Sequence, residues 1–350
     1  MAEATAIWFA APRHVELRRE AVAPPAAGQV LVAAVASGIS AGSELLVFRG
    51  HAPAELPPDL PTVAGDFGLP VKFGYASVGR VTQRGSGVEA PAEGDLVFAH
   101  HPHQSEYVVP ADAPILLPAE LSPELGVFTA NLETALTVVL DAQLRFGETA
   151  FVQGQGVVGL LITMLLARSG ASVVTADAYE RRRRLSLAAG AEQSLDPTVG
   201  VADALRELTG GRGADVAIEA TGNPAALQAC IDAVAFGGTV VVASWYGDRP
   251  AALDLGRAFH RRRIRIVSSQ VSTLDPALSG RWTRTRRTAL VRGLLGELPL
   301  AELITHRFPL SEAAAAYQLV DQRPEEAMQI IFRYDPARDD AVDGRPEPPA

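Results

Sequence analysis

Short apolar runs, separated by glycine, proline and polar residues, dominate the first third of the chain. Such runs favour β-strands, because strands are short and rich in branched and aromatic side chains. The candidates are Gln29–Val35, Gly74–Thr82, Asp95–Phe98 and Tyr107–Pro110. A proline-rich segment without periodicity, His51–Pro70, lies between the first two and is expected to be a long loop. Residues 1–120 are therefore predicted to form a β-rich domain.

From about Glu120 onward, helical and strand patterns alternate. Helices are predicted at Phe128–Leu140, Val157–Ala167, Pro224–Val234, Arg286–Leu295 and Ala313–Val320. Strands are predicted at Thr149–Val152, Ser172–Ala176, Asp215–Glu219, Thr239–Ala243, Ile264–Val267 and Gln329–Arg333. The alternation between Thr149 and Val267 is typical of right-handed βαβ units around a parallel sheet. The polar, proline-rich tail after Tyr334 is expected to be disordered.

Three glycines follow the strand Thr149–Val152 in the spacing G-x-G-x-x-G. In a dinucleotide-binding turn, Gly154 would allow the tight turn, Gly156 would let a pyrophosphate approach the backbone, and Gly159 would let helix and sheet pack closely. The start of the helix then offers free N–H groups to phosphates. The predicted phosphate-binding residues are Gly154, Gly156, Val157, Val158 and Gly159.

Further cofactor contacts are expected where the other parallel strands end, because those ends face the ligand. Asp177 ends the second strand, and its carboxylate would bind the adenosine ribose hydroxyls and repel a 2′-phosphate. Arg182 is near enough to stack on adenine or to meet a phosphate. The remaining candidates follow later strands and are Ala220, Thr221, Gly222, Ser244, Trp245 and Ser269.

Composition narrows the class of protein. The chain has 350 residues, 48% of them hydrophobic, which is enough for two domains. A net charge of −9 argues against a nucleic-acid surface. The single cysteine, Cys230, allows no disulfide within the chain and suits a reducing cytoplasm. The start of the chain lacks signal-peptide features, and the apolar helix near Leu160–Ala167 is too short to span a bilayer, so no membrane association is expected.

Several motifs together resemble the medium-chain dehydrogenase/reductase family. They are Ser37-Gly38-Ile39 with Gly42-Ser43-Glu44, Gly85-Ser86-Gly87-Val88, Gly94-Asp95-Leu96-Val97, Ala220-Thr221-Gly222 and Leu303-Ile304-Thr305-His306-Arg307. The stretches SGISAGSELLVFRG, FGYASVGRV, SWYG and SSQV are most similar to the subgroup named for bacteriochlorophyllide a dehydrogenase.

The resemblance implies a fold and its boundaries. It implies an α/β protein with a Rossmann doubly wound parallel sheet and a β-rich, GroES-like catalytic domain. We expect the first part of the catalytic domain at residues 1–122, the Rossmann domain at 123–271, a return segment at 272–334 and a tail at 335–350.

The chain departs from the zinc-binding members of that family. Where they have a cysteine the chain has Ser40-Ala41, offset by one residue, and their G-H-E is Gly74-Tyr75-Ala76. Only Glu133 stands where a third ligand belongs. One carboxylate cannot hold catalytic zinc, which takes three protein ligands. The four-cysteine structural zinc lobe is absent as well, so we expect no zinc.

His100, His101 and His103 lie within four residues and raise a separate question. They could bind a metal, but neighbouring side chains in an extended segment point in opposite directions, so His100 and His101 cannot easily share one ion. The alternatives are a neutral substrate-contacting histidine at His103, or ordinary loop histidines.

Without zinc, alcohol oxidation needs another proton acceptor and another partner for the developing carbonyl. By resemblance, Ser43 matches the proton-relay hydroxyl of the family. Tyr75 replaces a metal ligand and could donate to a substrate oxygen, although a phenol with an ordinary pKa is a poor base. The other catalytic candidates are Glu44, Glu133 and His103. The two glutamates could instead form salt bridges, and His103 could be an ordinary loop histidine.

The sequence therefore predicts an NAD(H)-dependent, zinc-independent oxidoreductase that interconverts a secondary alcohol and a ketone. One alternative is an NADPH-dependent quinone or enoyl reductase, and NADP stays possible because of the neighbouring arginines. An alternative of another class is a non-catalytic dinucleotide-binding sensor. The expected partners are a small-molecule substrate and a second copy of the chain, paired through the edge strand Ile264–Val267.

Overall fold

The computed structural model describes residues 2–58 and 65–334 of the chain. Part of the predicted long loop, residues 59–64, and the whole tail predicted to be disordered, residues 335–350, lie outside the described residues.

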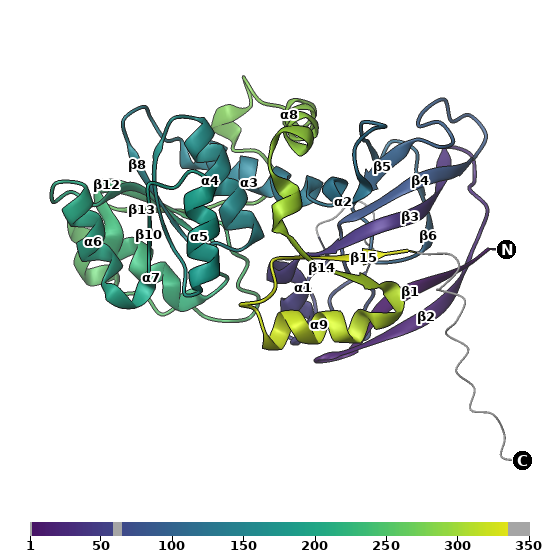
Figure 1. The fold of residues 1–350 in the computed structure, drawn as a ribbon, viewed down its shortest axis with the longest axis horizontal. Coiled ribbons are helices and arrows are strands. Elements are labelled where there is room, and N and C mark those ends of the chain that lie inside the picture. The colour runs from purple at the N-terminus through teal and green to yellow at the C-terminus, as the bar shows by residue number, and fades with distance from the viewer. Residues whose placement is uncertain (1, 59–64, 335–350) are drawn as a thin grey trace, which may run out of the picture. The chain divides into compact units, whose positions relative to one another are not determined.

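The chain divides into two compact units, drawn in Figure 1. Among the described residues, the first contains residues 2–58, 65–130 and 292–334, and the second contains residues 131–291. Residues 123–130 thus pack with the first unit and residues 272–291 with the second. The domain boundaries expected at residues 122 and 271 stay predictions.

The first unit is built on two sheets. A hairpin of β1 (Ala2–Ala11) and β2 (His14–Val22) forms the smaller sheet. The larger one has the order β14-β15-β3-β4-β5-β7, with β6 also paired to β3. Its strands are β3 (Gln29–Ile39), β4 (Ser77–Arg84), β5 (Leu96–Ala99), β6 (Glu106–Pro110), β7 (Ile115–Leu116), β14 (Ile304–Pro309) and β15 (Gln329–Arg333).

Helices close one end of this unit around an aromatic core. These helices are α1 (Ala41–Phe48) and α9 (Ala313–Gln322), whereas the short helix α2 (Pro123–Gly126) packs against β3 and β4. Figure 1 shows α1 beside α9, and Tyr317 of α9 stacks on Phe48 of α1 with ring centroids 5.5 Å apart. Phe9 meets both rings edge-on. Burying a side chain such as Phe48 contributes roughly 1.5–3 kcal/mol, so this core fixes α1 against the end of β3.

The second unit is a parallel six-stranded sheet with the order β10-β9-β8-β11-β12-β13. Its strands are β8 (Thr149–Gln153), β9 (Ser172–Ala176), β10 (Gln193–Leu195), β11 (Ala214–Glu219), β12 (Val234–Val242) and β13 (Arg265–Ser268). The helices of this unit are most of α3 (Thr129–Ala142), α4 (Val157–Arg168), α5 (Glu180–Ala188), α6 (Val201–Leu208), α7 (Pro224–Ala233) and α8 (Arg284–Glu297), the last of which continues into the first unit. The strand order reverses between β8 and β11, which is where doubly wound sheets bind ligands.

The structure corrects several local predictions. The strand expected from Thr239 begins at Val234 and passes through Gly237, where its register to β11 shifts. The strand expected from Gly74 begins only at Ser77, so Tyr75 lies in the preceding segment. The helix α1 and the hairpin β1–β2 were not predicted, because neither has a clear apolar period of its own.

The longest apolar helix is also not the one expected near Leu160. The helical run Pro123–Ala142, which includes α3 (Thr129–Ala142), has 20 residues and a mean hydropathy of 1.3. By length and composition alone it could cross a membrane. Since 72% of that window is buried inside the structure, the run has the character of a core helix.

Candidate active site

Three hydroxyl groups meet at the start of α1 in the first unit. Strand β3 ends at Ile39, Ser40 precedes the helix, and Ser43 lies in its first turn. The Tyr75 hydroxyl donates to Ser43 Oγ at 3.3 Å and also hydrogen-bonds with Ser40 Oγ. The structure thus brings the two predicted residues Ser43 and Tyr75 together and adds Ser40, which the sequence analysis did not select as a site residue.

The hydrogen-bond directions in this cluster follow from a count of protons. A phenol carries one proton, and the Tyr75 proton is donated to Ser43. Ser40 therefore donates to Tyr75, and the Ser43 proton is left to point elsewhere. Burial raises the pKa of Tyr75 above its ordinary value, and the nearby Glu44 charge raises it further, against the opposing effect of the two serines. Tyr75 is thus a neutral donor near neutral pH.

Glu44 lies beneath this cluster in the interior of the first unit. Its side chain is 0% exposed. One carboxylate oxygen accepts from the Ser40 backbone N–H at 2.8 Å. The other accepts from the Tyr317 hydroxyl and lies 3.0 Å from Nε2 of His103. The structure therefore gives the predicted catalytic residue Glu44 no surface that a substrate can touch.

His103 is likewise 0% exposed, although we expected it as a possible substrate contact. Its Nδ1 lies 2.7 Å from Ser37 Oγ, which lies 2.7 Å from the hydroxyl of half-buried Tyr334. The ring of His103 thus lies between a serine of β3 and the carboxylate of α1.

The other two histidines of the cluster have different surroundings. His101 stacks on Tyr107 with ring centroids 3.8 Å apart and an interplanar angle of 8°. Burial lowers the pKa of His101 to about 3, so its ring is neutral at physiological pH. His100 meets the Phe98 ring edge-on. Because the three rings have separate partners, they do not form one ligand set.

Glu133 lies in the second unit, in α3. It is buried, accepts a hydrogen bond from Thr288 Oγ1 at 3.0 Å, and has Nη2 of Arg287 at 3.7 Å. Arg287 also donates to Thr137 Oγ1 and to the carbonyl of Val271. Burial lowers the pKa of Arg287 below its usual value. Glu133 is thus part of an ion pair that joins α3 to α8.

The glycine turn after β8 has the geometry that a dinucleotide needs. Gly154 has φ +95°, and a Cβ there would lie 2.7 Å from the carbonyl group of Ala220. A Cβ on Gly159 would lie 1.9 Å from the Gly154 carbonyl oxygen, whereas one on Gly156 would meet open space. No side chain in the described residues caps the helix end formed by Gly156, Val157 and Val158. This end therefore offers backbone N–H groups to an anion.

Asp177 is tied to this turn. One of its carboxylate oxygens accepts from the Gln155 N–H at 2.7 Å, and the other accepts from the Tyr179 N–H at 2.8 Å. Nη1 of Arg182 lies 3.9 Å from the carboxylate, and its guanidinium covers the Tyr179 ring. The acid and the arginine expected at the adenosine end thus lie together beside the glycine turn.

The loops after β11 and β12 are held by a buried carboxylate that the sequence analysis missed. Glu219 accepts from the N–H and hydroxyl of Thr221 and from the Tyr246 hydroxyl at 2.6 Å. Gly222 N–H donates to Ser244 Oγ at 2.9 Å. Glu219 therefore links the predicted cofactor loops Ala220–Gly222 and Ser244–Trp245. The only sequence signal is an acid that ends an otherwise apolar strand.

The last predicted cofactor residue, Ser269, follows β13. Its N–H donates to the Val242 carbonyl at 3.0 Å, and its side chain hydrogen-bonds with Asp141 of α3. Trp245 is 36% exposed. All the predicted cofactor residues thus lie at the turn after β8 or beyond the carboxyl ends of the other strands.

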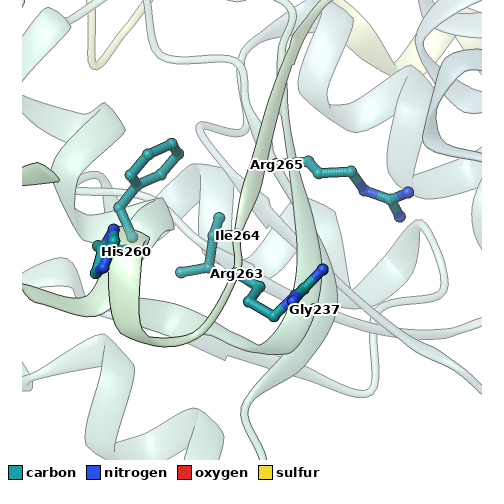
Figure 2. A pocket seen from close by; sticks show the side chains of 6 residues that line it. Gly237, His260, Arg263, Ile264 and Arg265 are labelled. Atoms are coloured by element: carbon teal, nitrogen blue, oxygen red, sulfur yellow. The ribbon is translucent and has the colours of Figure 1, made fainter.

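A hollow of about 510 Å³ lies elsewhere on the second unit, and Figure 2 shows side chains that line it. Its lining includes Gly237, His260, Arg263 and Arg265. These residues lie at the amino-terminal ends of β12 and β13, away from the loops at the opposite strand ends. The histidine and the two arginines do not converge on one point in Figure 2. The hollow is therefore separate from the predicted dinucleotide site.

The donor groups of the first unit do not fit zinc. Catalytic zinc is bound by thiolate, imidazole and carboxylate groups, three from the protein. Ser40, Ser43 and Tyr75 offer only neutral hydroxyls, and Glu44 and His103 are bonded to one another. Across residues 2–58 and 65–334, no three His, Cys, Asp or Glu side chains are grouped to hold an ion.

Comparisons with known proteins agree with this fold. A family model described as zinc-binding dehydrogenase matches residues 157–285. The D-guloside 3-dehydrogenase of Escherichia coli K12 is 30% identical over 267 residues, which cover 74% of this chain and 76% of that protein. The 2-desacetyl-2-hydroxyethyl bacteriochlorophyllide A dehydrogenase of Cereibacter sphaeroides is 28% identical over 348 residues, which cover 93% and 97%. The crystal structure of 2R,3R-butanediol dehydrogenase from Bacillus subtilis matches with a TM-score of 0.79 at 22% identity, over 95% of this chain and 100% of that one.

These similarities confirm the family resemblance and the fold class predicted from the motifs. They extend over both the β-rich unit and the parallel sheet. The chain therefore belongs to the zinc-binding dehydrogenase family, the medium-chain alcohol dehydrogenase-like group, and is an NAD(P)-dependent oxidoreductase of alcohols.

Proposed function

We propose that this chain is an NAD(H)-dependent, zinc-independent oxidoreductase that interconverts a secondary alcohol and a ketone. The observation that carries the proposal is the hydroxyl cluster of Ser40, Tyr75 and Ser43, in which Ser40 and Tyr75 stand where zinc-binding relatives are expected to place metal ligands. Three hydroxyls in a directed chain can deliver a proton to a carbonyl oxygen. They therefore replace the part of the chemistry that a metal would perform on the substrate oxygen.

The proton path follows the hydrogen-bond directions. In ketone reduction, the bound nicotinamide supplies the hydride. Ser43 gives its proton to the substrate oxygen, Tyr75 reprotonates Ser43, Ser40 reprotonates Tyr75, and Ser40 takes its replacement proton from solvent. Alcohol oxidation runs the same path in reverse. The neutral Tyr75 phenol is suited to donation near neutral pH, in line with its raised pKa.

Asp177 supports NAD(H) over NADP(H). Its carboxylate is fixed by the Gln155 and Tyr179 N–H groups beside the glycine turn and would repel a 2′-phosphate there. Arg182, which covers Tyr179, supplies a flat cationic surface next to the same position. The chain's own residues would thus bind the ribose hydroxyls through the acid.

A panel of candidate substrates tests the proposed ketone reduction. NADH oxidation is followed with a matched set of a secondary ketone, an α,β-unsaturated ketone and a quinone of similar size. The proposal expects the saturated ketone to be reduced to its alcohol. Reduction of the C=C bond alone would favour a quinone or enoyl reductase, and tight NADH binding without turnover would favour a dinucleotide-binding sensor.

We also propose a homodimer in the cytoplasm. Strand β13 is the edge of the parallel sheet, and its middle residues Ile266 and Val267 are only half-buried. An apolar edge strand is a liability unless it is covered, and a two-fold partner would cover it. Light scattering at micromolar concentration would find twice the chain mass, and a monomer would contradict the pairing.

Cys230 is the sole cysteine and is buried, which suits a reducing compartment.

A further inference from the structure

A network of polar groups leads from half-buried Tyr334 into the interior of the first unit and ends below the hydroxyl cluster. It leads from the Tyr334 hydroxyl to Ser37 Oγ, to the His103 ring and to the Glu44 carboxylate. Tyr317 of α9 donates to the same carboxylate oxygen as His103. The residues of this hydrogen-bond network are up to 297 positions apart in the sequence.

With a neutral His103 ring, the donors and acceptors of this network fit one arrangement. A carboxylate only accepts, so the proton lies on His103 Nε2 and points to Glu44. In the neutral ring, Nδ1 then accepts from the Ser37 hydroxyl, and Ser37 accepts from Tyr334. Each group along the chain donates once, toward the carboxylate. Fully satisfied buried networks of this kind hold their members rigidly.

The hydroxyl cluster rests on this chain at two points. The second carboxylate oxygen of Glu44, which does not contact His103, accepts from the backbone N–H of Ser40. The side chain of Ser40 in turn hydrogen-bonds with Tyr75. The His103 ring also packs under the segment that carries Tyr75, since a Cβ on Gly74 would lie 2.7 Å from Cδ2 of His103. A shift of the carboxylate therefore moves the Ser40 end of the Ser40–Tyr75 hydrogen bond, and a shift of the ring moves the Tyr75 end.

We propose that His103, Glu44, Tyr317, Ser37 and Tyr334 are positioning residues, which set the Ser40–Tyr75–Ser43 proton path without touching the substrate. This inference rests on the proposed function, because it takes that path as the place of proton transfer. It reassigns two residues that the sequence suggested as direct participants, Glu44 and His103. It also couples the site to Tyr334, the last residue of the chain that the structure describes.

The principal test variant is Tyr317→Phe, which removes one donor to Glu44 and keeps the ring stacked on Phe48. The matched control is Tyr107→Phe, which removes another buried hydroxyl of the same unit, one that donates to Ser77 Oγ at 3.0 Å. Two quantities are measured: hydrogen exchange of the Ser40 amide by NMR, and kcat and KM for ketone reduction. A second pair of variants, Tyr334→Phe and Ser37→Ala, tests the outer end of the chain.

The proposal expects Tyr317→Phe to speed Ser40 amide exchange and to lower kcat roughly 10-fold, the loss typical of a hydrogen bond to a charged group, while KM stays nearly unchanged. Tyr334→Phe should have the same effects in weaker form, and Tyr107→Phe should change neither quantity. Unchanged Ser40 exchange in both Tyr317→Phe and Tyr334→Phe would overturn the positioning role, as would equal effects in the Tyr107→Phe control. If the wild-type protein reduces no ketone, the proposed function fails, but the amide exchange still decides the positioning role.

Discussion

The Glu44 carboxylate lies 3.0 Å from Nε2 of His103, and both side chains are completely buried. This contact joins helix α1 to the segment after β5 and takes two reactive groups out of reach of a substrate. The hydroxyl groups of Ser40, Ser43 and Tyr75 lie together just after the end of β3. The candidate reactive surface of the first unit is therefore built from neutral hydroxyl donors, which the buried, hydrogen-bonded pair of Glu44 and His103 supports.

The first prediction concerns the terminal donor of the proton path. Ser43→Ala should lower kcat for ketone reduction by roughly 10²–10⁴-fold, the range for a lost acid/base group. NADH affinity should barely change, because Ser43 belongs to the first unit and the dinucleotide turn to the second. Steady-state kinetics and NADH fluorescence titration measure the two effects.

Tyr75→Phe is the companion variant, since it removes the phenol proton and keeps the ring. The hydrogen-bond directions predict a smaller loss than for Ser43→Ala, because the substrate still meets Ser43. A silent Ser43→Ala beside a strongly damaged Tyr75→Phe would show that the phenol itself donates to the substrate.

The second prediction concerns cofactor choice. Asp177→Ala should weaken NADH binding roughly 10- to 100-fold, as expected for hydrogen bonds to an ionised group. NADPH binding should weaken much less, because the charge that repels its phosphate is also removed. The ratio of the two dissociation constants is the quantity to measure, since Asp177 also holds Gln155 and any damage to the turn affects both cofactors. An unchanged ratio would mean that Asp177 does not bind the adenosine ribose.

The third prediction concerns acid stability. The pKa of His101 is about 3 in the folded chain, against an ordinary value of 6.5. Below pH 6.5 the unfolded chain gains a proton there and the folded chain does not, so the free energy of unfolding falls as the pH falls toward 3, by up to about 1.4 kcal/mol per unit. His101→Phe keeps a ring against Tyr107 and removes this titration.

Urea unfolding at pH 7 and pH 5 measures the effect. The loss of stability between the two pH values should be about 2 kcal/mol smaller in His101→Phe than in the wild type. Equal losses in both proteins would mean that His101 is protonated in the folded state.

The dinucleotide turn could be predicted because its information is local. Strand β8, the three glycines, helix α4 and Asp177 follow one another along the chain, and each depends on its immediate neighbours. The alternation of strands and helices then determined the parallel sheet. The β-rich unit was predicted only as a class, since its sheet pairs β3 with the distant strand β15.

The buried residues that support the candidate site could not be predicted, because they come from segments that are far apart in the sequence. Glu44, His103 and Tyr317 come from α1, the loop after β5 and α9, and no sequence pattern places these three side chains together. Glu219 looked like an ordinary strand end, although it links the loops after β11 and β12. Buried polar contacts between distant segments have no periodicity, so only the fold shows them.

Metal content and turnover of one sample test the central claim most directly. The protein is purified without a histidine tag, treated with a chelator and dialysed, and its zinc content and rate of NADH-dependent ketone reduction are then measured together. The hydroxyl path of Ser40, Tyr75 and Ser43 predicts zinc far below one per chain and an undiminished kcat. Loss of activity on chelation, with recovery when one equivalent of zinc is added, would contradict the account.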